Sequence, residues 1–221
     1  MGRKESRTAF GSVGEYYAWL KEEEDKYLNK GNKGISVGAQ WYEANLNLRD
    51  EIADLPEGTV VCDAGCADGR GIVGLQYALP RLQFIGVTPF IHTTPNSLFL
   101  NIFTPKKVPI YQGRIEELPG VLNRNGLQKP SVITARNVMW LVTLAETSAN
   151  GELAGFTGKA LLGLHDSLDS GGKALIYDEH LDMDFYAIYL RLIRESGLRF
   201  ESHLLPNHGG RCRSYPRLDR Y

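Results

Sequence analysis

The chain has 221 residues, of which 43% are hydrophobic and 23% charged, and 25 Lys and Arg residues nearly balance 26 Asp and Glu residues. This balance excludes a globally basic nucleic-acid-binding protein and an acidic disordered tail. The apolar runs are far shorter than the roughly 18 residues of a membrane span, and we expect no signal peptide. The cysteines, Cys62, Cys66 and Cys212, lack CxxC spacing, so we expect no metal site and a reducing cytoplasm.

Two helices are predicted before the first strand. Apolar residues recur at helical spacing between residues 15 and 30, and Gly31 ends that helix. Ser36 is a candidate N-cap of a second helix, which Pro56 ends. We therefore expect residues 1–56 to form an N-terminal arm and a helical cap.

From residue 57 onward the pattern changes to short apolar strands that alternate with helices. The expected strands are 59–63, 82–87, 108–112, 132–135, 173–178 and 198–205. The expected helices are 71–79, 98–103, 156–168 and 185–196. A last segment, 211–218, is expected to pair back as a hairpin strand. The alternation predicts an α/β domain over 57–221 with a doubly wound, mostly parallel sheet.

A glycine-rich turn joins the first strand to the next helix, in the sequence Asp63-Ala-Gly65-Cys-Ala-Asp68-Gly69-Arg-Gly71. Gly65 and Gly69 allow a sharp turn and a close approach of a ligand to the backbone. The helix that begins at Gly71 offers free N–H groups to an anion. Asp63 either holds a ligand ammonium group or fixes the loop. A tight turn without a ligand is the alternative interpretation.

Dehydrogenase chemistry is disfavoured. The dinucleotide pattern G-x-G-x-x-G fails because Ala67 and Arg70 stand where it requires glycine. A short-chain dehydrogenase also needs a Tyr-x-x-x-Lys pair beyond the middle of the chain. The only such pair, Tyr17 and Lys21, precedes the glycine turn.

The glycine turn resembles motif I of the class I S-adenosylmethionine-dependent methyltransferases, D-x-G-x-G/A-x-G. Three later segments resemble further motifs of this family in the same order, namely 112–119, 168–178 and 192–200. The resemblance covers roughly residues 58–205. It implies a Rossmann-like, seven-stranded sheet, S-adenosylmethionine as the cofactor and S-adenosylhomocysteine as the product.

The resemblance also implies which residues contact the cofactor. They are Asp63, Gly65, Cys66, Ala67, Gly69, Thr88, Arg114, Ile115 and Asn137. Cys66 is expected to pack and not to act as a nucleophile.

Two of these positions depart from the family pattern. Thr88 replaces a carboxylate that accepts the ribose hydroxyls, and Arg114 replaces an Asp that bonds the adenine amino group, so we expect Arg114 to point away. The backbone N–H of Ile115 remains available to the adenine. Either His92 or Thr93 substitutes at the ribose, or the site has drifted to a modified cofactor or to interaction alone.

Candidate catalytic residues follow the fifth predicted strand. His180 is the candidate general base because imidazole titrates near neutral pH, and Glu179 is a candidate to orient it. A surface histidine in a turn is the alternative. The candidate substrate-binding residues are aromatic or apolar, with core packing as their alternative role: Tyr16, Tyr17, Trp41, Met139 and Trp140.

We therefore expect a cytoplasmic S-adenosylmethionine-dependent methyltransferase that methylates oxygen or nitrogen of a small or medium organic acceptor. Neither a membrane nor a nucleic acid is an expected partner, and the sequence is compatible with a homodimer. The alternative is a non-catalytic, methyltransferase-like protein that binds a partner through its helical cap.

Overall fold

The computed structural model describes residues 10–29, 48–91, 107–136, 138–148, 155–177, 191, 194, 200–206 and 212–219. Several sequence-based predictions fall on other residues. The helix at 98–103, most of the helix at 185–196, Trp41, His92, Thr93, Asn137, Glu179 and His180 lie outside the described residues.

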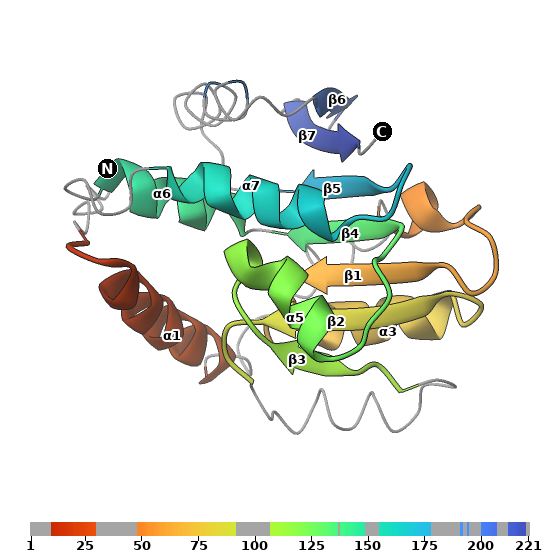
Figure 1. Ribbon diagram of the computed structural model, residues 1–221, viewed down its shortest axis with the longest axis horizontal. Coiled ribbons are helices and arrows are strands. Elements are labelled where there is room, and N and C mark those ends of the chain that lie inside the picture. Colours follow the sequence, from red (N-terminus) through yellow and green to blue (C-terminus); the bar gives the residue numbers. More distant parts are fainter. Residues whose placement is uncertain are drawn as a thin grey trace.

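The centre of the molecule is a mostly parallel sheet with the strand order β3-β2-β1-β4-β5-β7-β6 (Figure 1). Its strands are β1 (Val60–Ala64), β2 (Gln83–Thr88), β3 (Ile110–Gln112), β4 (Val132–Arg136), β5 (Lys173–Tyr177), β6 (Phe200–Pro206) and β7 (Cys212–Asp219). Strands β1 to β5 pair in parallel, and β7 runs antiparallel to both β5 and β6. The prediction of a mostly parallel α/β sheet is confirmed, and so is the pairing of the last segment as a hairpin strand.

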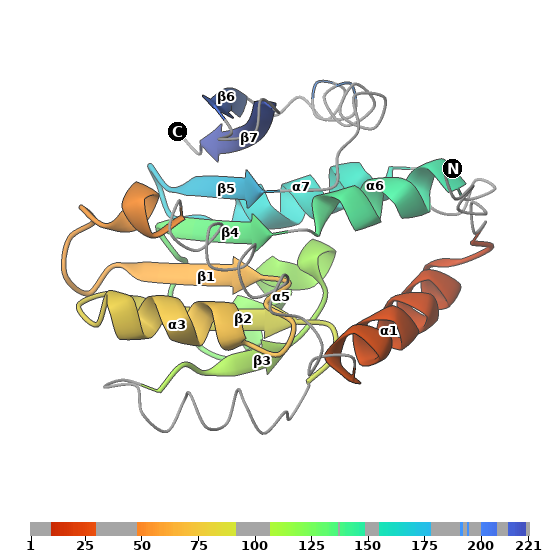
Figure 2. The same cartoon turned by 180° about the vertical axis from the view of Figure 1, so that it is seen from behind.

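Helices cover both faces of the sheet (Figures 1 and 2). One face carries α3 (Arg70–Ala78) and a helical segment at 48–52. The other face carries α5 (Leu118–Arg124), α6 (Met139–Ser148) and α7 (Phe156–Ser167). The alternation of side chains along β1 shows the two layers, because Val61 belongs to the same buried cluster as Ile72 of α3, whereas Cys62 belongs to the cluster that contains Leu161 of α7. Thus the β1 residue Asp63 points to the same face as Val61.

The segments after β3 and β4 differ from the prediction. A 3-10 turn, η1 (Ile115–Glu117), leads into α5, and α6 begins at Met139, although no helix was predicted at either place. Pro119 in the first turn of α5 is a typical helix-start signal. In α6, Met139, Val142 and Ala145 are buried, but the segment has few polar residues to mark an opposite face.

Helix α1 (Val13–Asn29) confirms the first predicted helix and crosses the edge of the sheet where the parallel strands end (Figure 1). Its start is capped by Ser12, whose Oγ accepts a hydrogen bond of 3.1 Å from the Glu15 N–H, while the Glu15 carboxylate accepts one of 2.7 Å from the Gly11 N–H. Phe10, Tyr16, Tyr17 and Leu20 are buried against the rest of the molecule.

Among the described residues, no helix is both long enough and apolar enough to cross a bilayer. The described residues also contain no group of three or more His, Cys, Asp or Glu residues that could hold a metal ion.

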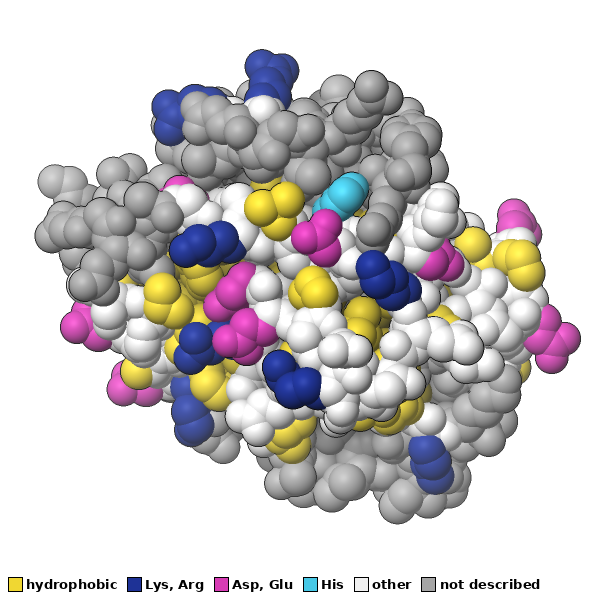
Figure 3. Space-filling model, in the orientation of Figure 1, with side chains coloured by type: hydrophobic (Ala, Val, Ile, Leu, Met, Phe, Trp, Pro, Cys, Tyr) yellow, Lys and Arg dark blue, Asp and Glu magenta, His cyan; other side chains and the backbone are white. Residues whose placement is uncertain are grey.

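The face that carries α5 and α7 mixes both signs of charge. Figure 3 shows acidic and basic side chains interspersed over its described part, with hydrophobic side chains scattered between them. This distribution agrees with the formal net charge of −1.

Candidate functional site

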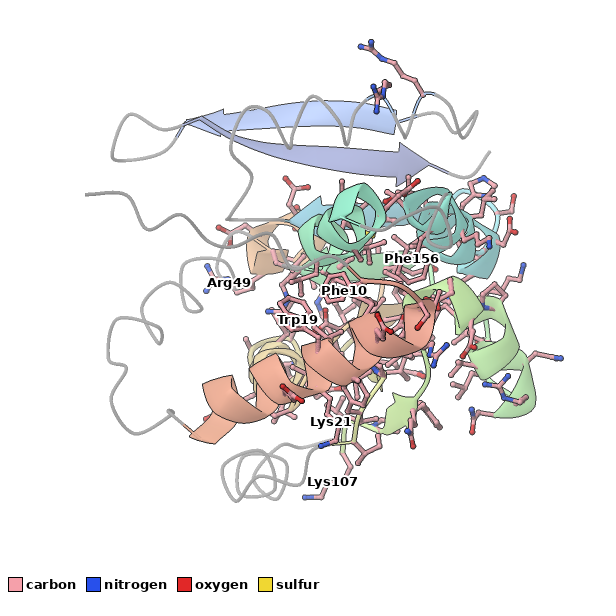
Figure 4. All side chains as sticks on the ribbon, turned by 90° about the vertical axis from the view of Figure 1, so that its left-hand side faces the viewer. Phe10, Trp19, Lys21, Arg49, Lys107 and Phe156 are labelled. Carbon is pink, nitrogen blue, oxygen red and sulfur yellow. The ribbon has the colours of Figure 1, made fainter. Side chains whose placement is uncertain are left out.

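The carboxyl ends of β1, β2, β3 and β4 meet at one edge of the sheet, which we call the strand-end site. The chain leaves β1 toward β2 and β3 and returns to β4 on the other side of β1, so the direction of winding reverses there. Ligands of open α/β sheets bind at such reversals. Helix α1 passes directly in front of this edge (Figure 4).

The glycine turn after β1 needs its glycines for their backbone conformation. Gly65 and Gly69 have φ angles of 84° and 79°, and Ala67 between them has a φ of 49°. Such left-handed conformations cost a residue with a Cβ roughly 1–2 kcal/mol. The N–H groups of Gly65 and Cys66 both donate to the carbonyl of Val87, at 2.7 and 3.1 Å, which ties the turn to β2.

The same glycines also allow close packing. A Cβ at Gly65 would collide with Val138, and one at Gly69 would collide with Ile110. A Cβ at Gly71 would lie 2.5 Å from the guanidinium of Arg136. The conformation of the glycine turn therefore depends on side chains from β3 and from the end of β4 as well as on its own backbone.

The start of α3 fits an anionic ligand group. Its N-cap residue is Gly69, which has no side chain with which to bond the first N–H groups of the helix. Those N–H groups, which lack partners within a helix, point toward the strand-end site together with the positive end of the helix dipole.

The Asp63 side chain joins the end of β1 to β4, and its role toward a ligand stays a prediction. Its side chain is buried, and it accepts hydrogen bonds of 2.8 Å from the Thr134 hydroxyl at Oδ1 and of 2.5 Å from Arg136 Nη2 at Oδ2. Both oxygens are thus engaged by β4. Sequence reasoning missed Thr134 and gave Arg136 no role. The signal was an arginine at the end of an apolar strand, since a buried carboxylate in a neighbouring strand requires a donor or a cation.

Thr88 lies at the end of β2 and is completely buried. Its hydroxyl donates a 3.2 Å hydrogen bond to the carbonyl of Phe90, and its own carbonyl accepts a 2.9 Å bond from Gly113 N–H. The proton of the hydroxyl is therefore used within the turn, and the oxygen keeps acceptor capacity only.

Arg114 and Ile115 lie where η1 begins. The Ile115 side chain is 6% exposed and packs in the core. The guanidinium of Arg114 lies over the ring of Tyr17, with its central carbon 4.2 Å from the ring centroid. Arg114 thus reaches α1.

Tyr17 and Glu116 form a further contact that sequence reasoning missed. The Tyr17 hydroxyl donates a 2.8 Å hydrogen bond to Glu116 Oε2. Burial raises the pKa of both groups above their ordinary values, so the phenol stays protonated and available as a donor. A carboxylate 99 positions away in the sequence carries no local signal for this pairing.

The substrate candidates are placed as follows. Tyr16 and Tyr17 are 1% and 6% exposed and make edge-to-face contacts with Phe156. Figure 4 shows Phe10, Trp19 and Phe156 gathered between α1 and the adjoining helices. Met139 is completely buried in the core, the alternative considered for it, and the Trp140 side chain is not among those described.

Cys66 is a packing residue within the turn. It is 3% exposed, and its sulfur lies against Gly86 of β2, where an added Cβ would approach it to 2.7 Å. Burial raises the pKa of its thiol well above the ordinary value, so the thiolate is absent at neutral pH.

No family model matches the sequence, and the comparison with curated proteins finds no match. Solved structures do match. The 1,6-didemethyltoxoflavin-N1-methyltransferase of Burkholderia thailandensis, solved with bound 1,6-didemethyltoxoflavin and S-adenosylhomocysteine, has a TM-score of 0.64 and 15% identity, over 96% of this chain and 92% of that one. The YcgJ protein of Bacillus subtilis has a TM-score of 0.55 and 13% identity, over 80% and 98% of the two chains.

A third structure, the N-methyltransferase NodS of Bradyrhizobium japonicum in complex with S-adenosylhomocysteine, has a TM-score of 0.52 and 11% identity, over 81% of this chain and 86% of that one. At these identities the similarity concerns the fold alone. The chain therefore has the fold of class I S-adenosylmethionine-dependent methyltransferases.

Proposed function

We propose that the protein is an S-adenosylmethionine-dependent methyltransferase that methylates oxygen or nitrogen of a small or medium organic acceptor. One observation carries the proposal: a glycine turn with left-handed backbone at residues 65, 67 and 69 enters α3 at the point where the sheet reverses its winding. Two of the solved proteins with this fold hold S-adenosylhomocysteine.

The proposal assigns the parts of the cofactor to groups already described. The backbone of the glycine turn and the first N–H groups of α3 would hold the methionine portion and its carboxylate. Thr88 Oγ would accept from a ribose hydroxyl, and the Ile115 N–H would bond the adenine. When bound, S-adenosylmethionine supplies a methyl group already activated on a sulfonium.

The chain's own contribution is to orient the acceptor and to remove a proton where the acceptor carries one. Where the acceptor carries a proton, His180, oriented by Glu179, would take that proton as the acceptor oxygen or nitrogen receives the methyl group. A helical cap formed by residues 1–56 would cover the acceptor. Because Tyr16 and Tyr17 are already packed, Trp41 and Trp140 are the remaining candidates for direct contact with it.

Calorimetric titration with S-adenosylmethionine and S-adenosylhomocysteine tests the proposal. Binding with a micromolar Kd supports a methyltransferase, and no binding up to millimolar concentration overturns it. Gly65→Val should abolish binding because it places a branched side chain against Val138 in a left-handed backbone. Gly171→Ala is the matched control, since Gly171 also has a positive φ, of 80°, but its added Cβ would meet no atom within 4 Å.

The structure of Thr88 favours a second candidate function. A buried hydroxyl that already donates to Phe90 is a weaker ribose partner than a carboxylate. A methyltransferase-like protein that binds a partner without catalysis is therefore the alternative, and the same titration separates the two because this alternative predicts no cofactor binding.

A further inference from the structure

Tyr17 connects α1 to the segments that follow two strands of the site. Its ring makes edge-to-face contacts with Phe90, which follows β2, and with Phe156, which begins α7, each at 6.3 Å between centroids. Its hydroxyl reaches Glu116, which follows β3. One side chain thus anchors α1 over the ends of β2 and β3.

Two polar contacts fix this side chain, and both come from the segment that follows β3. Glu116 Oε2 accepts from the Tyr17 hydroxyl at 2.8 Å, and the Arg114 guanidinium covers one face of the ring at 4.2 Å. The first is a hydrogen bond to a partly buried carboxylate and the second a cation–π contact. Together they fix both the hydroxyl group and one face of the Tyr17 ring.

The segment that supplies both contacts is itself held by α7. A Cβ added at Gly163 would collide with the Ile115 carbonyl oxygen and would lie 3.0 Å from Glu116 Cα. Helix α7 therefore approaches the η1 backbone as closely as a glycine permits. A larger residue at 163 would displace Glu116 from Tyr17.

We propose that Arg114 and Glu116 are positioning residues that hold Tyr17, and with it α1, closed over the nucleoside side of the cofactor site. This inference rests on the proposed function, in which the ends of β2 and β3 face the ribose and the adenine. Arg114 then serves the closing helix and not the adenine. The cofactor enters and leaves when the contacts of Tyr17 open.

If α1 acts as a gate to the cofactor site, loosening Tyr17 should change how fast the ligand enters and leaves. Association and dissociation rates of S-adenosylhomocysteine, measured by stopped flow, test this. Tyr17→Phe keeps the ring and removes the hydrogen bond, so α1 should open more often, and both rates should rise by about tenfold with little change in Kd. Arg114→Met, which keeps the apolar stem, should raise both rates by about threefold. Damage to the site itself would raise the dissociation rate and Kd without raising the association rate, which would overturn the proposal.

Two matched controls separate gating from lost stability. Ser131→Ala removes another hydroxyl–carboxylate bond, the 2.6 Å bond to Asp169 at the opposite edge of the sheet, and should leave both rates unchanged. Gly163→Ala should raise both rates by displacing Glu116. Gly158→Ala in the same helix, where an added Cβ meets no atom within 4 Å, should not.

A second readout needs no cofactor. Hydrogen exchange of the α1 amides in the ligand-free protein should accelerate in Tyr17→Phe and Gly163→Ala but not in Ser131→Ala. If the unaltered protein fails to bind S-adenosylhomocysteine, the proposed function falls and the gate falls with it. If that protein binds and Tyr17→Phe changes neither rate, the gate alone is overturned.

Discussion

Thr88 occupies the position where the resembling family carries a ribose-binding carboxylate, and its surroundings explain why a hydroxyl suffices for the fold. The side chain is completely buried, and its proton is donated to the carbonyl of Phe90. A carboxylate cannot make that donation and would be costly to bury without a ligand. The local structure therefore favours threonine whether or not a cofactor is bound.

We expect Thr88→Asp to lower the free energy of unfolding by about 2 kcal/mol in the ligand-free protein, and Thr88→Val to lower it by about 1 kcal/mol. Urea unfolding measures both. Thr59→Val, which removes an exposed hydroxyl–carbonyl bond of 2.7 Å to Pro56, is the control and should have a smaller effect. If S-adenosylmethionine restores stability to Thr88→Asp more than to the unaltered protein, the new carboxylate contacts the ribose. A stability of Thr88→Asp equal to that of the unaltered protein would contradict the burial argument.

Glu116 gives a prediction about pH. Burial is the main cause that raises its pKa above the ordinary value of 4.5, while Tyr17 and Arg114 act in the opposite direction and Glu117 raises it further. Between pH 4.5 and the raised pKa of Glu116, the folded state therefore binds more protons than the unfolded state. The free energy of unfolding falls as the pH rises through this range. Glu116→Gln keeps an oxygen acceptor for Tyr17 and removes the titration.

Unfolding of Glu116→Gln and of the unaltered protein should therefore be compared from pH 4 to pH 8. The stability of the variant relative to the unaltered protein should increase as the pH rises through the pKa of Glu116. Glu57→Gln, at an exposed carboxylate that is not among the groups acting on Glu116, is the control. A difference that stays constant or moves in the opposite direction would show that Glu116 does not titrate as its burial requires.

The regular elements show what the sequence could predict and what it could not. Strands β1, β2, β4 and β5 and helices α1, α3 and α7 were predicted because each has a clear apolar pattern bounded by Gly or Pro. Helix α6 was missed because its residues are mostly apolar and show no period, and α5 because its seven residues are too few to show one. Strand β7 was predicted to pair with β6, but its pairing with β5 depends on the whole sheet.

The position of β7 decides what removing the C-terminal segment would do. Because β7 lies between β5 and β6, deletion of residues 210–221 removes the strand that joins β6 to the sheet. We expect a cooperative loss of stability, measured by thermal unfolding, together with weaker binding of both cofactor and acceptor. A selective, salt-dependent rise in the acceptor KM at unchanged stability would instead show that the arginines of this segment bind an anionic acceptor.

At the scale of the whole molecule, the site is assembled from contacts between residues far apart in the sequence. The glycine turn was predictable because its residues are contiguous and the strand and helix around it are regular. The Asp63–Arg136 pair spans 73 positions and the Tyr17–Glu116 pair spans 99, so each exists only once the sheet order and the place of α1 are set. Sequence patterns predict the individual helices and strands, whereas these pairs depend on how the helices and strands are arranged in space.

The Asp63–Arg136 ion pair links β1 and β4 beside the start of α3, and both of its side chains are largely buried. The exposed fractions of the two side chains are 2% and 9%. Arg136→Met leaves the Asp63 charge buried with the Thr134 hydroxyl as its remaining side-chain partner among the described residues, so the free energy of unfolding should fall by about 3–5 kcal/mol. Asp63→Val removes the carboxylate that pairs with the Arg136 guanidinium and should also lower the free energy of unfolding.

The double variant Asp63→Val/Arg136→Met should lose less stability than the sum of the two single variants, because both members of the ion pair are removed together. Chemical unfolding of the four proteins gives this coupling directly. Additive losses would mean that water reaches the pair and that the tie is weaker than its burial indicates. The double variant should also bind S-adenosylhomocysteine more weakly than its stability alone would suggest, since the Arg136 guanidinium that packs against Gly71 is gone and the start of α3 is no longer held beside the glycine turn.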